Sequence, residues 1–241
     1  MRILAFETSA KAASAALLTD GVLTAEAYQH DGQTHSRTVL KLAEDLLENC
    51  GLSPADLDLV AWANGPGSFT GVRIGAAAAK GLCWGLELPC EAVSTLEAMA
   101  WNAVDLEGIL CCCMDARRSQ VYNALFRARE GRLERLREDR AISIGELAAD
   151  LAAFDEPVRL IGDGAALVFD TLASERAHTV RPYLVSEARR QQRAVGVALA
   201  AWAAAQAGQV GNPGAVAPNY LRLSQAERER LERDKELRKG D

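Results

Sequence analysis

Hydrophobic and polar residues follow strand and helix periodicities in turn along the first third of the chain. The segments RILAFETS (residues 2–9) and AASAALLTDGVLTAEAY (residues 12–28) read as three strands, the last two joined at Asp20-Gly21. Such a dipeptide favours a tight hairpin turn. In residues 36–50 apolar side chains recur at helical spacing. The pattern predicts a three-stranded meander followed by an amphipathic helix.

A glycine-rich loop separates a buried strand from a second helix. LDLVAWA (residues 57–63) is mostly apolar, as in a buried strand, and FTGVRIGAAAAKGLCWGLEL (residues 69–88) predicts a helix that Pro89 ends. A short strand, CEAVS (residues 90–94), and a helix from about Thr95 follow. Strands alternating with helices are typical of an α/β protein.

The same order then repeats. GILCCCMDARRSQVYNALFRAREGRLERL (residues 108–136) again shows strand, acidic residue, polar turn, strand, glycine turn and strand. Glu7 corresponds to Asp115, and the Asp20-Gly21 turn corresponds to Glu130-Gly131. Residues further on predict a helix, SIGELAADLAAF, a strand, VRLIG, and one long alanine-rich helix from Ser186 to about Gln206. The chain is therefore expected to contain a duplicated α/β unit.

The repeat sets the expected boundaries. We assign residues 1–104 to an N-terminal unit and residues 105–222 to a C-terminal unit, allowing the long helix of the second to pack back on the first. Residues 223–241 carry charges of both signs and almost nothing apolar, which is typical of a solvated helix or frayed tail.

Composition narrows the classes of function. The net charge of −6 argues against a dominant nucleic-acid binder, because affinity for phosphate backbones comes chiefly from Lys and Arg. Neither a signal peptide nor a membrane-spanning run is apparent, so a cytoplasmic location is expected. No C-x-x-C pair exists, and neighbouring strand residues point to opposite faces, so reduced, buried thiols are expected rather than a metal site at the six cysteines: Cys50, Cys83, Cys90, Cys111, Cys112 and Cys113.

The glycine loop allows two interpretations from spacing alone. A loop between a strand and a helix N-terminus suits an anion. The glycines form G-x-G-x-x-x-G, which matches neither the dinucleotide fingerprint nor a Walker loop, so a turn without a ligand stays open. No nucleophile elbow surrounds the loop hydroxyls, and helix capping is their expected role. The residues of interest are Gly65, Gly67, Ser68, Thr70, Gly71 and Arg73.

Several segments together carry a family resemblance. ILAFETS, NGPGSFTGVRIG, VSTLEAMA, MDAR and NYLR, in this order from Arg2 to about Arg222, resemble the bacterial TsaB family, also called YeaZ, of tRNA threonylcarbamoyladenosine biosynthesis proteins. The resemblance implies the actin-like ATPase (ASKHA) fold with two ribonuclease H-like subdomains. It also implies that the protein acts with the threonylcarbamoyl transferase TsaD and the ATPase TsaE. Together they would modify the adenosine 3′ of the anticodon in tRNAs reading codons that begin with A.

The resemblance further implies a subunit without its own chemistry. Where the related transferase has an H-x-x-x-H metal motif, this chain has Thr95 and Met99, which are poor ligands for hard or borderline divalent metals. The expectation is a scaffold with no catalytic residue, metal or cofactor, touching tRNA only through the complex. Whether the free protein forms a homodimer is left open.

The first phosphate loop of actin-like ATPases corresponds to Glu7, Thr8 and Ser9. Lys11 and Ala12 stand where the transferase has acidic residues, so we expect a degenerate phosphate site. The alternative function is an active actin-like ATPase or small-molecule kinase, which would turn over nucleotide by itself.

Two surfaces are candidates for binding. The resemblance implies that the helices at residues 36–50 and 69–88 form a four-helix bundle with their equivalents in TsaD, and the expected contacts are Leu42, Leu46, Ala77 and Trp84. Packing of Trp84 inside its own subdomain is the alternative. Arginines in residues 117–140 suggest a direct tRNA clamp, but acidic residues interleave with them, so an internally paired face is favoured.

Overall fold

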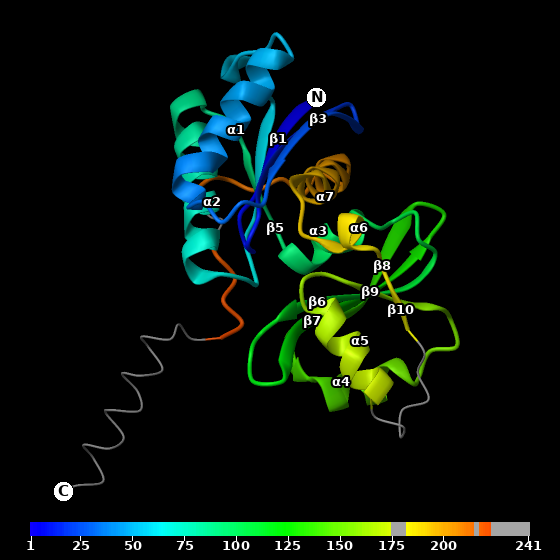
Figure 1. Cartoon of the computed structure of the whole chain (residues 1–241). Helices are drawn as coiled ribbons and strands as arrows, with labels where there is room; N and C mark the ends of the chain where they lie inside the picture. Colours follow the sequence, from blue (N-terminus) through cyan, green and yellow to red (C-terminus); the bar gives the residue numbers. More distant parts are fainter. Residues whose placement is uncertain (175–181, 215–216, 223–241) are drawn as a thin grey trace, which may run out of the picture.

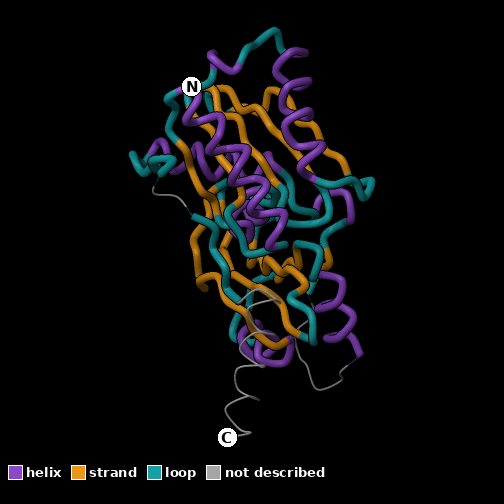
Figure 2. Tube along the Cα trace, turned by 90° about the vertical axis from the view of Figure 1, so that its left-hand side faces the viewer, coloured by secondary structure: helices purple, strands orange, loops and turns teal. Residues whose placement is uncertain are grey.

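The computed structural model describes residues 1–174, 182–214 and 217–222, in two lobes (Figures 1 and 2). The predicted tail at residues 223–241 lies outside the described residues. The first lobe contains β1 (Arg2–Glu7), β2 (Ala13–Thr19), β3 (Val22–Gln29), α1 (His35–Asn49), the 3-10 turn Pro54–Asp56, β4 (Leu59–Ala63), α2 (Phe69–Leu86), β5 (Cys90–Val93) and α3 (Thr95–Trp101). The second contains β6 (Gly108–Asp115), β7 (Gln120–Arg129), β8 (Arg132–Ser143), α4 (Ile144–Leu151), β9 (Val158–Ile161), α5 (Ala165–Ser174) and β10 (Tyr183–Leu184), before α6 (Glu187–Arg190) and α7 (Ala194–Gln206).

Both lobes share one topology. The first sheet has the order β3-β2-β1-β4-β5, and the second has the order β10-β9-β6-β7-β8. In each, the first three strands are antiparallel neighbours and the last two add in parallel. This is the ribonuclease H-like arrangement, present twice, so the expected α/β actin-like ATPase fold is confirmed.

The two turns that marked the repeat have the same backbone geometry. Asp20 and Gly21 have φ values of 49° and 80°, and Glu130 and Gly131 have φ values of 52° and 71°. Positive φ at both central residues matches the twist of a two-residue hairpin. The local sequence signal is therefore sufficient to place both hairpins.

Side chains alternate between two cores across the first sheet. Leu4 and Phe6 of β1 face α1 and α2, whereas Ile3 and Ala5 face α7. The second sheet alternates likewise: Ile109 faces α4 and α5, whereas α3 packs on the other face. The layers α1/α2, sheet, α7 with α3, sheet, α4/α5 follow from this alternation (Figure 1).

The cysteine triplet follows the same rule. Cys111 and Cys113 lie in the core under α4 and α5, and Cys112 lies in the core under α3. Five of the six thiols are buried and Cys50 is half-buried, all reduced. The predicted opposite facing of neighbouring thiols is confirmed.

The single long helix predicted from Ser186 to Gln206 is wrong. It is broken into α6 and α7 because Gln191 and Arg193 adopt extended backbone angles. The buried Gln192 side chain donates to Asp163 Oδ1 at 2.8 Å, and Arg193 forms an ion pair with Glu26. These long-range contacts replace a local helical turn, and α7 then packs on the first sheet and α3.

Candidate functional site

The glycine loop packs against the end of β1. Ser68 caps α2, its Oγ accepting from the Gly71 N–H at 3.2 Å, as predicted for a loop hydroxyl. The Ser68 N–H donates to the Ser9 carbonyl at 2.7 Å, and Thr8 Oγ1 donates to the Gly71 carbonyl at 2.8 Å. The loop is thus hydrogen-bonded to its own chain at both ends.

Two glycines of the loop allow this close approach. A Cβ atom on Gly67 would lie 2.5 Å from the Ser9 carbonyl oxygen, and one on Gly71 would lie 2.0 Å from the Thr8 carbonyl oxygen. Backbone atoms cannot yield as a flexible side chain can. The glycines are therefore required for packing, whether or not an anion binds the loop.

Glu7, at the end of β1, is buried with 1% of its surface exposed. Its Oε1 accepts the Ser9 N–H at 2.5 Å, whereas its Oε2 has no hydrogen-bond partner. Burial raises the pKa of Glu7 from 4.5 to about 7, and the nearby charge of Asp163 adds to the rise, although hydrogen bonds from Ser9 oppose it. A carboxyl in this setting braces the Thr8–Ser9 turn.

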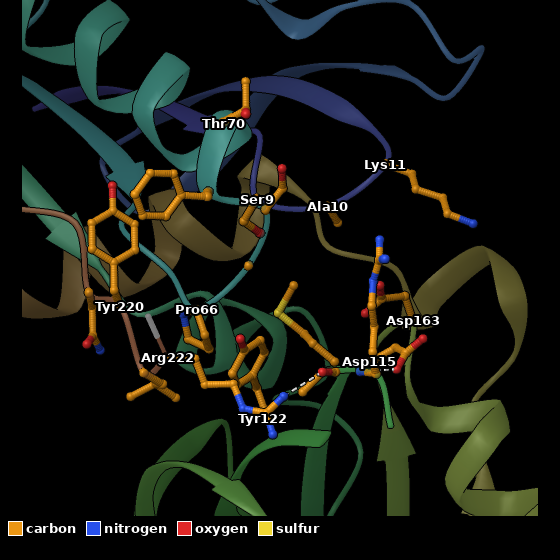
Figure 3. Close-up of a pocket in the computed structure, with 18 residues that line it drawn as sticks. Ser9, Ala10, Lys11, Pro66, Thr70, Asp115, Tyr122, Asp163, Tyr220 and Arg222 are labelled. Carbon is orange, nitrogen blue, oxygen red and sulfur yellow. Dashed lines mark hydrogen bonds between the residues drawn. The ribbon is translucent and has the colours of Figure 1, made fainter. Parts of the chain in front are cut away.

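A cleft of about 620 Å³ lies at the carboxyl ends of β1 and β6, between the lobes (Figure 3). Crevices at such strand ends are where open α/β sheets bind ligands. Cationic and acidic groups share its wall. The lining includes Ser9, Lys11, Pro66, Thr70, Asp115, Arg117, Tyr122, Asp163, Tyr220 and Arg222.

The sequence motifs mark residues of both lobes in this cleft, whereas Asp163 lies outside them. The Ser9 end of the first phosphate loop and the glycine loop both line it, as does Asp115, the counterpart of Glu7 in the repeat. Asp163 and Tyr220 come from segments far along the chain. For Tyr220, its place in the NYLR motif is the one signal that the sequence offers.

Thr95 and Met99, which the resemblance aligns with the histidines of the transferase, lie in the core. Thr95 begins α3 and Met99 lies one turn later, both fully buried. Met99 packs with Leu96 and Leu110. Among residues 1–174, 182–214 and 217–222, no group of three or more His, Cys, Asp or Glu side chains is placed to hold a metal ion. In the same residues, no helix has the length and apolar character to cross a bilayer.

The four residues predicted to contact the partner differ in how exposed they are. Trp84 is 66% exposed and Ala77 is exposed, so most of the Trp84 indole does not pack within its own subdomain. Leu42 is half-buried against the first core. Leu46 is only 5% exposed, so naming it as a surface contact is wrong: the wide apolar arc of α1 is used to cover β2 and α2.

The arginine-rich meander is largely paired with acidic side chains of the chain itself. Arg135 bonds Glu97 and Asp139, each at 2.8 Å. Arg140 bonds Asp150, and Arg127 lies between two glutamates, Glu134 and Glu156. The favoured interpretation of an internally paired face is confirmed for these arginines.

Comparisons with known proteins agree with the sequence motifs. The family model of TsaD, tRNA N6-adenosine threonylcarbamoyltransferase, matches residues 21–230. The tRNA threonylcarbamoyladenosine biosynthesis protein TsaB of Bacillus subtilis is 33% identical, with 98% of this chain and 100% of that protein covered. A tRNA N6-adenosine threonylcarbamoyltransferase of Methanopyrus kandleri is 43% identical over 74 residues, 31% of this chain and 20% of that one.

A solved structure shows the same fold over nearly the whole chain. YeaZ from Pseudomonas aeruginosa superimposes with a TM-score of 0.78 at 26% identity, covering 91% of this chain and 99% of that one. The topology, the motifs and these relatives lead to one conclusion: the chain belongs to the TsaB (YeaZ) family of tRNA threonylcarbamoyladenosine biosynthesis proteins.

Proposed function

We propose that this protein is a non-catalytic scaffold and activator of the transferase TsaD in the formation of N6-threonylcarbamoyladenosine beside the anticodon of tRNAs reading codons that begin with A. The B. subtilis relative is named for threonylcarbamoyladenosine biosynthesis, and both the family model and the M. kandleri relative are named for the transferase. TsaE is the second partner in this proposal, and tRNA meets the protein only within the complex.

The observation that carries the proposal is the exposed indole of Trp84 on α2. At 66% exposure it stands beside Gly81 and Gly85, where an added Cβ would meet nothing within 4 Å. A large aromatic next to open, small positions suits helix-on-helix docking, and aromatic anchors dominate interface energies. The α1 and α2 helices lie side by side on this face (Figure 1).

Three further observations support the absence of catalytic chemistry. Thr95 and Met99 are committed to the core, and the one carboxylate kept in the first phosphate loop, that of Glu7, is buried behind Ser9. Lys11 is exposed at the cleft, where the transferase is acidic. A pseudo-enzyme subunit is therefore favoured over an ATPase or kinase.

Reconstitution tests the proposal directly. The chain alone, TsaD alone and their mixture are assayed for tRNA modification, each with TsaE, ATP and threonylcarbamoyl-adenylate. We expect no product from the chain alone and a large stimulation of TsaD by the mixture. The Trp84→Ala variant should lose the stimulation, whereas Tyr183→Ala, an exposed aromatic of the second lobe, should keep it. Product formed without TsaD, or no stimulation by the wild type, contradicts the proposal.

A further inference from the structure

The segment that follows α7 returns along the first lobe to the cleft. The Cys90 N–H donates to the Gly211 carbonyl at 3.2 Å, and the Gly211 N–H donates to Glu91 Oε2 at 2.9 Å. Further on, the Asn219 N–H donates to the Asn64 carbonyl at 2.7 Å. We call residues 219–222 the strap, because they lie across the glycine loop and line the cleft (Figure 3).

The strap packs so closely against Gly65 that this position has no room for a side chain. A Cβ atom on Gly65 would lie 2.5 Å from the Asn219 carbonyl oxygen, and φ at Gly65 is +109°, which L side chains rarely adopt. The first glycine of the loop thus serves the docking of a segment more than 150 positions later in the chain. The GPG and NYLR motifs form one structural unit.

Tyr220 fixes the strap to α2. Its ring stacks on Phe69 with the centroids 4.4 Å apart, and its hydroxyl accepts from Arg73 Nε at 3.0 Å. The Arg73 guanidinium lies 3.9 Å from the centre of the Phe69 ring. A stacked aromatic pair covered by a cation is a stable anchor on the first lobe.

Arg222 reaches the other lobe. Its guanidinium donates to the Ala116 carbonyl at 2.7 Å, in the loop between β6 and β7, as Figure 3 shows. Within four residues, the chain is therefore bonded to the glycine loop, to α2 and to the second lobe. In the described residues, the lobes are also joined at α3, where Ser94 at its N-cap donates to Asp139, and at the α6–α7 segment, where Gln192 bonds Asp163 and Arg193 pairs with Glu26.

We propose that the strap is a clasp that holds the cleft at one opening. Tyr220 is its anchor and Arg222 its closing bond. Because Arg222 donates to a backbone carbonyl, the bond has one charged partner and breaks without leaving a buried ion, which suits a contact that opens and closes. Among the residues that the structure describes, no hydrogen bond outside the strap joins the glycine loop to the β6–β7 loop. The clasp is a conformational property of the free chain and does not depend on TsaD.

Double electron–electron resonance, which measures the distance between two spin labels, tests the clasp. Spin labels are placed at Glu44→Cys on α1 and Asp155→Cys beyond α4, both exposed, in a Cys50→Ser background because Cys50 is the one thiol that is not fully buried. We expect one narrow distance distribution for the parent. Arg222→Ala and Tyr220→Ala should each give a longer mean distance and a broader distribution.

Arg129→Ala is the matched control, since the ionic partner of this exposed arginine among the described residues is Glu130, at 3.9 Å. It should leave the distribution unchanged. Thermal melts separate opening from unfolding, and Arg222→Ala, which removes one surface bond, should melt as a folded protein. A folded Arg222→Ala variant with the parental distribution would overturn the clasp, whether or not Tyr220→Ala folds.

Discussion

The Thr8 carbonyl oxygen occupies the space that a side chain on Gly71 would need: a Cβ there would lie 2.0 Å from it. The contact joins the first turn of α2 to the end of β1 and is made entirely by backbone on the Thr8 side. Glycine at this position is therefore a packing requirement of the fold, and a ligand is not needed to explain it.

This contact predicts that Gly71→Ala destabilises the protein by at least about 1 kcal/mol, because either α2 or the Thr8 turn must move. Gly81→Ala is the control: Gly81 is also inside α2, nothing lies within 4 Å of its Cβ position, and alanine there should stabilise by up to about 1 kcal/mol. Urea unfolding of both variants measures the difference. Equal stability of the two would refute the packing argument.

Gly67→Ala distinguishes a structural loop from a ligand site. The Cβ would press on the Ser9 carbonyl at 2.5 Å, so a loss of roughly 1 kcal/mol or more is expected in a thermal or urea melt. If the variant melts like the wild type yet abolishes activity of the reconstituted complex, the loop binds a ligand instead.

Ala77→Glu should weaken TsaD binding by more than about ten-fold while leaving the melt unchanged. Ala77 is exposed on α2, and an unpaired carboxylate buried in an interface costs more than about 1.4 kcal/mol. Ala153→Glu makes the same change at an exposed site in the second lobe and should bind normally. Calorimetric titration is the measurement, and unchanged affinity of Ala77→Glu would place the interface elsewhere.

Alanine substitutions of Leu46 and Trp84 are predicted to have different effects, the first on stability and the second on TsaD binding. Leu46→Ala removes a buried side chain and should cost about 2–5 kcal/mol of stability. Trp84→Ala removes an exposed one and should change the melt little while weakening TsaD binding. Melting and binding measured on both variants test this. A Trp84→Ala variant that is destabilised as much as Leu46→Ala would show that the indole packs internally.

The raised pKa of Glu7 predicts that the stability of the protein depends on pH. Its folded pKa of about 7 lies above its ordinary value of 4.5, so the folded state holds the proton more tightly than the unfolded state. The contribution of Glu7 is therefore fully present below pH 4.5 and is lost as the pH rises through about 7.

The Glu7→Gln variant keeps an oxygen for the Ser9 N–H and removes the titration. Relative to the wild type, it should gain stability between pH 5 and pH 8, by up to about 3 kcal/mol, since a tenfold change in proton affinity equals about 1.4 kcal/mol. Urea unfolding at both pH values gives the difference. A constant difference across this range would mean that Glu7 is ionised in the folded protein throughout.

The isolated chain is predicted neither to hydrolyse ATP nor to hold a structural metal. Phosphate release and elemental analysis are the measurements, with Glu7→Ala as the diagnostic variant. Stoichiometric zinc or iron, or ATP turnover that Glu7→Ala abolishes, would restore the alternative of an active actin-like ATPase or kinase.

Much of the architecture is determined by local sequence. Alternating side chains in β1 and β6, the Asp20-Gly21 and Glu130-Gly131 turns, and the capping residue Ser68 each depend on neighbours a few positions away. Hydrophobic period, turn chemistry and capping are short-range properties, so the duplicated meander and the helices that follow can be predicted from the sequence alone.

Tertiary structure decided what depends on distant contacts. A helical wheel shows that α1 has a wide apolar arc, but the sheet and α2 determine that Leu46 is buried, just as the layer order leaves Trp84 exposed. The break before α7 follows from the bond between Gln192 and Asp163. The strap on Gly65 joins residues that no local period relates, because a contact across such a separation depends on the path of the whole chain.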